Sequence, residues 1–159
     1  MAIAKNPPVY GTWERQHTGV AAESSVSART WAAPIGRALI SGIFIASGIG
    51  KLAGWGETAA FMNAQGIVAV QLFLPLAILV ELGCGLALLA GFKARWAAMG
   101  LFLFLIPTTY IFHDFWTFAG PERQAQMAQF MKNLAIMGGL LLVVAFGAGR
   151  ASIDERSHS

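Results

Sequence analysis

The chain has 159 residues, of which 56% are hydrophobic and 12% charged, and its mean hydropathy is +0.59. This composition is far more apolar than that of an ordinary soluble domain, so it excludes the soluble classes and indicates a membrane protein. The net charge of +3 is spread over loops and termini rather than gathered into a basic stripe with interleaved aromatic residues, which argues against a nucleic-acid partner.

Residues 1–33 are polar, contain a Pro-Pro pair and show no sustained periodicity, so we predict a flexible cytoplasmic N-terminal tail. A tail of this kind is a usual docking segment for another protein. No apolar stretch within it ends in a small-residue cleavage site, so we expect no removable signal peptide.

The apolar residues that follow come in long blocks, which favours helices over the alternating pattern of a membrane barrel. Four spans are predicted, at 34–52, 75–91, 96–112 and 130–146. Each has roughly 17 residues, or about 26 Å of helix, which is just enough to cross a hydrocarbon layer. The apolar piece before the second span, "GIVAVQLFL" (66–74), is too short to cross and is interpreted as an interfacial or re-entrant segment.

The fold class is therefore all-α: an integral membrane four-helix bundle over 34–149, followed by a short cytoplasmic C-terminal tail at 150–159. Lysine and arginine residues concentrate on the side that would hold both termini, so the positive-inside rule places both termini in the cytoplasm. We expect a multi-pass protein of the bacterial inner (cytoplasmic) membrane. Small residues spaced four apart predict smooth packing faces on the first two spans: Gly42, Ala46 and Gly50, and Gly83, Ala87 and Gly91.

One carboxylate, Glu81, lies inside the otherwise uncharged run 74–91. A charge at mid-bilayer costs about 2.5 to 3.5 kcal/mol on insertion scales, so this acid must be neutral, hydrated or paired. It lies about 9 Å below the outer end of its helix. Lys51 closes the first span at that same side, with Ser47 one turn before it, and Lys51 is therefore a candidate partner.

The other two spans carry polar residues at the same level, and turning all of these inward would create a polar pocket. The predicted ligand-binding residues are Lys51, Glu81, Tyr110, His113, Lys132 and Asn133, with Glu81 and His113 as catalytic candidates. Simpler explanations stand beside this one. Snorkelling to the headgroups accounts for Lys51 and Lys132 taken singly, His113 can be an interfacial cap, and a pair at Glu81 can be a clamp between helices as readily as a ligand site.

The sequence offers little for a tightly bound cofactor. The single cysteine, Cys84, excludes an internal disulfide and a CxxC pair, and no nucleotide-binding, zinc or haem-ligand pattern is found. We expect no metal and no covalently bound cofactor. Any redox chemistry would then use a membrane-soluble carrier such as a quinone, or the cofactor of a partner.

Four segments together resemble the DoxX family of small four-helix bacterial membrane proteins: "GRALISGIFIASGIGKL" (36–52), "VELGCGLALLAG" (80–91), "FHDF" (112–115) and "QFMKNLAIMGGLLLVVAFGAGRASID" (129–154). The resemblance covers most of 34–154. It implies a role in membrane oxidoreductase complexes, since some members are the membrane subunit of thiosulfate:quinone oxidoreductase. It implies no catalytic set, but the family's recurring residues fall at Lys51, Glu81, His113, Lys132 and Asn133.

Three hypotheses follow. The leading one is an accessory or quinone-interacting subunit of a respiratory-type oxidoreductase complex, with Lys51 and Lys132 as electrostatic anchors, Glu81 as proton acceptor, and His113 and Tyr110 as hydrogen-bond partners of a quinone-like or small anionic ligand. The alternative is a non-catalytic scaffold or assembly subunit that contacts other membrane subunits through its N-terminal tail and lipid-facing helices. A small-solute carrier is less favoured, because four short helices without an evident inverted repeat give little room.

Overall fold

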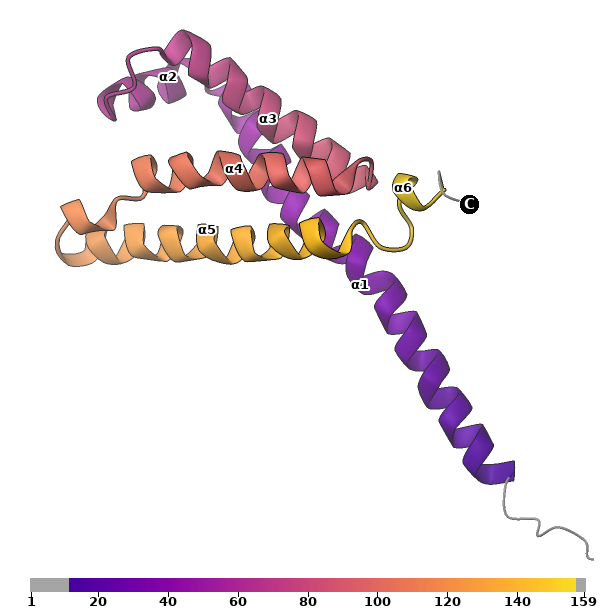
Figure 1. Ribbon diagram of the computed structural model, residues 1–159. Coiled ribbons are helices and arrows are strands. Elements are labelled where there is room, and N and C mark those ends of the chain that lie inside the picture. The colour runs from indigo at the N-terminus through magenta and orange to yellow at the C-terminus, as the bar shows by residue number, and fades with distance from the viewer. Residues whose placement is uncertain (1–11, 157–159) are drawn as a thin grey trace, which may run out of the picture.

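The computed structural model describes residues 12–156, with side chains from residue 31 onward, and every regular element in that part of the chain is helical (Figure 1). The elements are α1 (Thr12–Ala53), α2 (Trp55–Ala64), α3 (Val70–Ala90), α4 (Ala94–Phe112), the 3-10 turn η1 (Phe115–Thr117), α5 (Gly120–Phe146) and α6 (Ile153–Arg156). Four stretches are long and apolar enough to cross a membrane: Trp31–Ala53, Val70–Ala90, Ala94–Thr117 and Gly120–Phe146. The predicted all-α fold with four spanning helices is confirmed.

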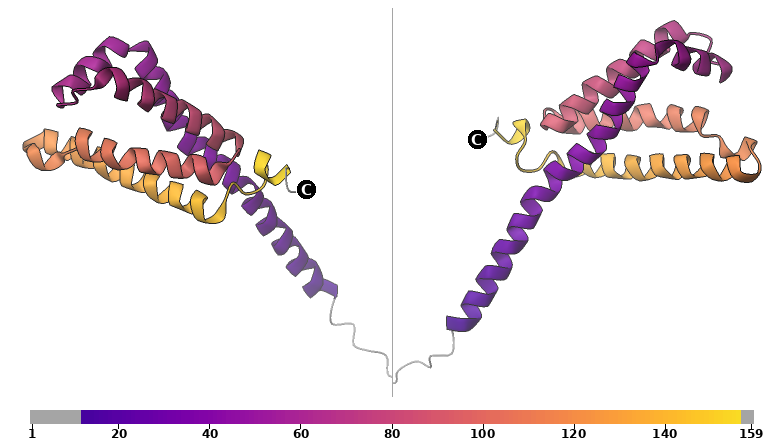
Figure 2. Two further views of the ribbon diagram at one scale, coloured as in Figure 1. Left: turned by 45° about the horizontal axis from the view of Figure 1, so that its top comes forward. Right: turned by 180° about the vertical axis from the view of Figure 1, so that it is seen from behind.

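The helices form two pairs that share one interface. α1 packs mainly on α3, α3 on α4, and α4 on α5, whereas α1 and α5 meet only briefly, where Ile40 approaches Gly139. The α1–α3 pair and the α4–α5 pair lie close together near α6 and diverge toward α2 (Figures 1 and 2). α6 and the Thr12 side of α1 lie at the same end of the bundle, as an even number of spans requires; the side of the membrane on which they lie stays a prediction.

Two apolar clusters hold the pairs together. The larger joins all four spans near the end where the pairs meet, and includes Phe44, Leu88, Leu101 and Leu140. The smaller lies between α2 and α3 and contains Met62, Val70, Leu74 and Ile78. It reaches α4 through a stacked contact between Phe61 and Phe112, whose ring centroids are 5.5 Å apart. Large apolar side chains elsewhere on the spans are exposed, as expected of a lipid-facing surface.

The first helix differs from its prediction. It begins at Thr12, so the segment 12–33 is helical rather than irregular, and Pro34 lies inside the helix instead of in its first turn. Alanine and glutamate, which have high helix propensity, recur through 12–33 and favour this conformation. Residues 1–11 lie outside the described residues, and the flexibility of the tail stays a prediction.

Three later boundaries also differ. α3 begins at Val70, so most of the piece interpreted as interfacial belongs to the second span, and Pro75 is internal to it. α5 begins at Gly120, ten residues before the predicted start, with Pro121 in its first turn. α2 was not predicted. Its residues mix polar and apolar side chains without a clear pattern, and Met62 packs against α3 in the structure. The segment after α5 also carries a short helix, α6, in place of a plain tail.

The predicted small-residue faces are only partly used. A Cβ added at Gly42, Gly50 or Gly83 would meet no atom within 4 Å, so these glycines face open space. The close approach of α1 and α3 occurs instead at Gly48 and Gly85. A Cβ at Gly48 would lie 2.7 Å from the Leu82 side chain. Of the predicted α3 face, Ala87 packs against the larger apolar cluster and Gly91 lies against Ser152. The predicted face of α1 is wrong, because spacing alone does not fix helix rotation.

Candidate functional site

The contact between α1 and α3 carries a buried ion pair. Glu81 is 4% exposed, and its Oε1 accepts hydrogen bonds from Lys51 Nζ at 2.9 Å and from Ser47 Oγ at 3.0 Å. Lys51 Nζ also donates to Ser47 Oγ at 2.6 Å. The three side chains therefore close a triangle, and Lys51 is the residue found beside the acid, as its place at the end of the first span suggested.

The backbones bring these side chains into reach. Gly48 lies against Glu81 Cβ and Leu82, and Gly85 lies against Phe44 and Ile45, so the two helices approach closely through two glycines. Ser47 and Lys51 are four residues apart and share one face of α1, beside Gly48. A short hydroxyl can then reach an acid on the neighbouring helix without a water between them.

The second carboxylate oxygen of Glu81, Oε2, is buried and makes no hydrogen bond within the part of the chain that the structure describes. Buried polar atoms are nearly always paired, because losing water without a replacement costs about 1 to 3 kcal/mol. Lys51 has also used only two of its three N–H donors, and its side chain is 25% exposed. The pair therefore retains one acceptor and one donor that the described residues leave unused.

The remaining predicted residues form two other contacts. Asn133 on α5 is buried and donates from Nδ2 to Thr109 Oγ1 on α4 at 3.0 Å. His113 Nδ1 lies 3.0 Å from Gln126 Oε1, which ties the end of α4 to α5. Among the described residues, no hydrogen bond or ion pair connects either contact with Glu81. Each contact joins helices within the α4–α5 pair, whereas the ion pair joins α1 and α3.

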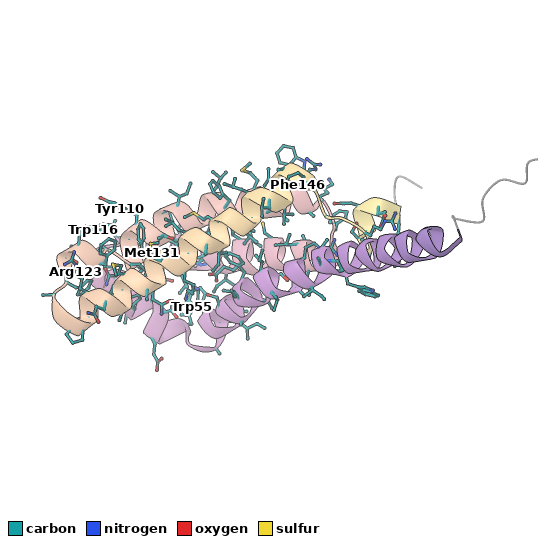
Figure 3. The ribbon with its side chains drawn as sticks, turned by 90° about the horizontal axis from the view of Figure 1, so that it is seen from below. Trp55, Tyr110, Trp116, Arg123, Met131 and Phe146 are labelled. Carbon is teal, nitrogen blue, oxygen red and sulfur yellow. The ribbon has the colours of Figure 1, made fainter. Side chains whose placement is uncertain are left out.

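Tyr110 and Lys132 point away from the interior. Tyr110 is 67% exposed, and its ring lies 5.4 Å from that of Trp116 at the end of the bundle where Arg123 lies (Figure 3). Lys132 is exposed and donates to Gln129 one turn earlier on α5. Each follows or precedes a buried residue, Thr109 or Asn133, by one position, and the helix turns about 100° per residue, so both face outward. The six residues predicted to share one pocket are thus divided among the ion pair, two separate contacts between α4 and α5, and the outer surface.

A second polar cluster, which the sequence analysis did not identify, lies at the α6 end. Arg37 is buried, and its guanidinium donates to the carbonyl oxygens of Ala148 and, at 2.8 Å, Ala151. Asp154 accepts from the backbone N–H groups of Lys93 at 2.7 Å and Ala94 at 2.9 Å. We call the segment 147–156, with these contacts, the C-terminal clasp. It fastens α1, the α3–α4 turn and α5 to one another.

The clasp depends on glycine at its crossing point. Gly91 has φ +67° and ends α3, and a Cβ there would lie 2.5 Å from the Ser152 Cβ. Gly147 and Gly149 also have positive φ. The two glycines in "GAGRASID" (147–154) were the sequence signal that could have indicated the clasp. A chain that must turn sharply and pass close to another backbone uses glycine.

The described residues contain no group of three or more histidine, cysteine, aspartate and glutamate side chains that could hold a metal ion. What the ion pair can do chemically is bind and hold protons. A carboxylate with one unpaired oxygen accepts a hydrogen bond or a proton from a hydroxyl, and the spare N–H of Lys51 donates to a carbonyl or phenolate oxygen.

Comparison with known proteins gives two family matches. The DoxX family model matches residues 32–114 and the SURF4 family model matches residues 74–159. The chain is 40% identical over 121 residues to the inner membrane protein YqjF of Escherichia coli, covering 76% of this chain and 88% of that protein. It is 30% identical over 122 residues to the inner membrane protein YphA of the same organism, covering 77% and 87%.

A more distant match is the ER-derived vesicles protein ERV29 of Saccharomyces cerevisiae, 36% identical over 66 residues, which are 42% of this chain and 21% of that protein. No solved structure matches the chain. The two bacterial matches and the four apolar helices agree with a multi-pass protein of the bacterial inner membrane.

Proposed function

The chain belongs to the DoxX family and shares residues 74–159 with the SURF4 family pattern, and on that premise we propose that it is a quinone-interacting subunit of a bacterial membrane oxidoreductase. The observation that carries the proposal is the unpaired Oε2 of buried Glu81, next to a lysine with an unused donor. A quinone supplies two-electron, two-proton chemistry, and in its reduced form a ring hydroxyl accepts a hydrogen bond from a donor and gives one to an acceptor.

The residues of this chain have distinct parts in that proposal. Lys51 donates its free N–H to a ring oxygen, while Glu81 Oε2 accepts a hydrogen bond, or a proton, from a ring hydroxyl. Ser47 positions both groups, because it bonds to each of them. The electrons pass to the redox centre of a partner subunit. This chain thus contributes a binding site and a proton acceptor inside the membrane.

The substitution Glu81→Gln tests the proposal. The purified protein in a neutral detergent is titrated with a short-chain benzoquinol kept in its reduced form, and the quenching of tryptophan fluorescence is followed. Losing a charge-assisted hydrogen bond of about 1.5 to 3 kcal/mol should weaken binding about 10- to 100-fold. Glu57→Gln, an exposed acid on α2, is the matched control and should bind as the native chain does.

Native membranes provide the second readout. A strain that lacks the protein is complemented with each variant, and quinol oxidation and the amount of inserted protein are measured. Glu81→Gln should lower turnover at unchanged insertion. Equal quinone binding and turnover in Glu81→Gln and the native chain would refute the proposal.

A non-catalytic scaffold is the second candidate. The observation that favours it is the length of α1, which continues far beyond the bundle on the α6 side (Figure 1). A partner that copurifies in fixed ratio with both the native chain and Glu81→Gln, together with no quinone binding by the native chain, would support the scaffold and count against the quinone proposal.

A further inference from the structure

A groove of about 510 Å³ lies at the α6 end of the bundle, between the start of α4 and the C-terminal clasp. Its lining combines three basic residues, two acids and one tryptophan with backbone of the clasp. The side chains concerned are Lys93, Arg95, Trp96, Arg150, Asp154 and Glu155. It lies at the opposite end of the spans from Arg123 and Trp116, as the position of Phe146 in Figure 3 indicates. We call it the basic groove.

The two acids of the basic groove are committed to the protein itself. Asp154 accepts from two backbone amides at the start of α4, and Glu155 Oε2 accepts from the Ala151 N–H at 2.9 Å. Their negative charge is therefore held against backbone donors and the positive end of a helix. The two acids therefore do not neutralise the charge of all three basic side chains.

The three basic side chains of the groove differ in the hydrogen bonds that they form with the protein. Arg95 Nη1 donates to the carbonyl oxygens of Val144 at 2.9 Å and Ala145 at 3.0 Å, so this side chain caps the end of α5. The side chains of Lys93 and Arg150 are exposed, and among the described residues neither side chain forms a hydrogen bond or ion pair; the Lys93 ammonium lies over the Phe92 ring. Two cations are thus available to an anion from outside.

The position of the groove relative to the membrane indicates what kind of anion it would bind. α3 ends at Ala90, α4 begins at Ala94 and α5 ends at Phe146, so three spans leave the apolar layer here. Trp96 and Phe146, 77% and 79% exposed, flank the groove and present large apolar rings outward. Aromatic rings at span ends lie at the headgroup level of a bilayer. The groove therefore places charge beside phosphate groups and aromatic surface beside acyl chains.

From this arrangement we propose that the basic groove binds the phosphate of an anionic phospholipid headgroup, with Lys93 and Arg150 as the contacting cations and Trp96 against the upper acyl chain. Basic pockets between spans at a membrane surface suit such headgroups. The volume of about 510 Å³ is large enough for a phosphoglycerol headgroup. The site is separate from the ion pair at Glu81 and does not depend on the proposed function.

The test is lipid binding by the purified full-length protein in neutral detergent, counted by native mass spectrometry. Phosphatidylglycerol and phosphatidylcholine are titrated separately at fixed ionic strength. Each basic residue near a membrane surface contributes about 1 kcal/mol, so Arg150→Gln should weaken phosphatidylglycerol binding about fivefold. Lys93→Asn with Arg150→Gln should weaken it about 30-fold. Asparagine is chosen because residue 93 has φ +44°, which asparagine adopts readily.

Arg123→Gln is the matched control, because it removes an exposed arginine at the other end of α5. It should leave phosphatidylglycerol binding unchanged. The proposal is overturned if phosphatidylcholine binds as tightly as phosphatidylglycerol, or if Arg150→Gln behaves like Arg123→Gln. Displacement of bound phosphatidylglycerol by equimolar inorganic phosphate would also overturn it, since the site would then recognise a free anion. A loss of binding at unchanged thermal stability shows that the variants act on the site rather than on the fold.

Discussion

Removing the lysine of the buried ion pair should cost more stability than removing the charge of its acid. Lys51→Met breaks the 2.9 Å bond to Glu81 and leaves a carboxylate, 4% exposed, with one serine as its remaining donor. Breaking a fully buried pair from one side costs about 3 to 5 kcal/mol. Because Lys51 is a quarter exposed, some water already reaches the pair, and we expect about 2 to 3 kcal/mol.

Glu81→Gln has a milder effect for a physical reason. The amide oxygen still accepts from Lys51 and Ser47, and the ammonium that loses its counter-charge can extend toward the headgroups. We expect about 1 kcal/mol, the usual contribution of a single hydrogen bond. The double variant should then lose less than the sum of the two single variants, because the uncompensated carboxylate is no longer present.

Reversible unfolding in mixed detergent micelles, followed by circular dichroism, measures all three variants on one scale. Lys132→Met is the control, since that lysine is exposed and bonds only within its own helix; it should change stability by less than about 0.5 kcal/mol. If Glu81→Gln proved more destabilising than Lys51→Met, or if the two effects added fully, the pair would not be the buried, mutually dependent unit described above.

Three further outcomes are expected, each read from the same unfolding assay. Gly48→Ala should destabilise by about 1 to 3 kcal/mol, because the new methyl group would overlap a leucine of α3, whereas Gly42→Ala faces open space and should be neutral or slightly stabilising. Asp154→Ala removes the cap from the first amides of α4 and should cost about 0.5 to 2 kcal/mol; an unchanged value would show that the clasp does not fasten that helix. Asn133→Leu and Thr109→Val should be coupled by about 0.6 kcal/mol in a double-mutant cycle, and full additivity would contradict the hydrogen bond between them.

Depth and chemistry predicted that Glu81 needs a partner and made Lys51 one of the candidates, but they did not predict how the helices are rotated. A short acid within an apolar run needs a partner, and the end of the first span supplied one lysine at the correct level. Tyr110 and Lys132 lie at the same level but one residue away from the buried faces of α4 and α5, and depth alone does not distinguish inward from outward. The same ambiguity explains why Gly48, and not Gly42, forms the contact with α3.

The helix boundaries and the clasp could not be predicted from the local sequence pattern, and the reason is different. α2 and the first half of α5 contain mixed polar and apolar residues, whose helical state depends on packing against other elements. Nothing near Arg37 in the sequence indicates that the carbonyl groups of Ala148 and Ala151 accept hydrogen bonds from its guanidinium. Contacts between residues more than 100 positions apart require the tertiary arrangement.

The capping of α4 by a residue 60 positions downstream has a consequence for biosynthesis. All four membrane segments have been translated when Phe146 is added, yet the amides at the beginning of the third segment still lack their acceptor until Asp154 emerges from the ribosome. Closure of this end therefore cannot precede the synthesis of Asp154. A tag fused directly after Arg156 would lie beside that closure, so a spacer, or a fusion elsewhere, is the safer choice for expression.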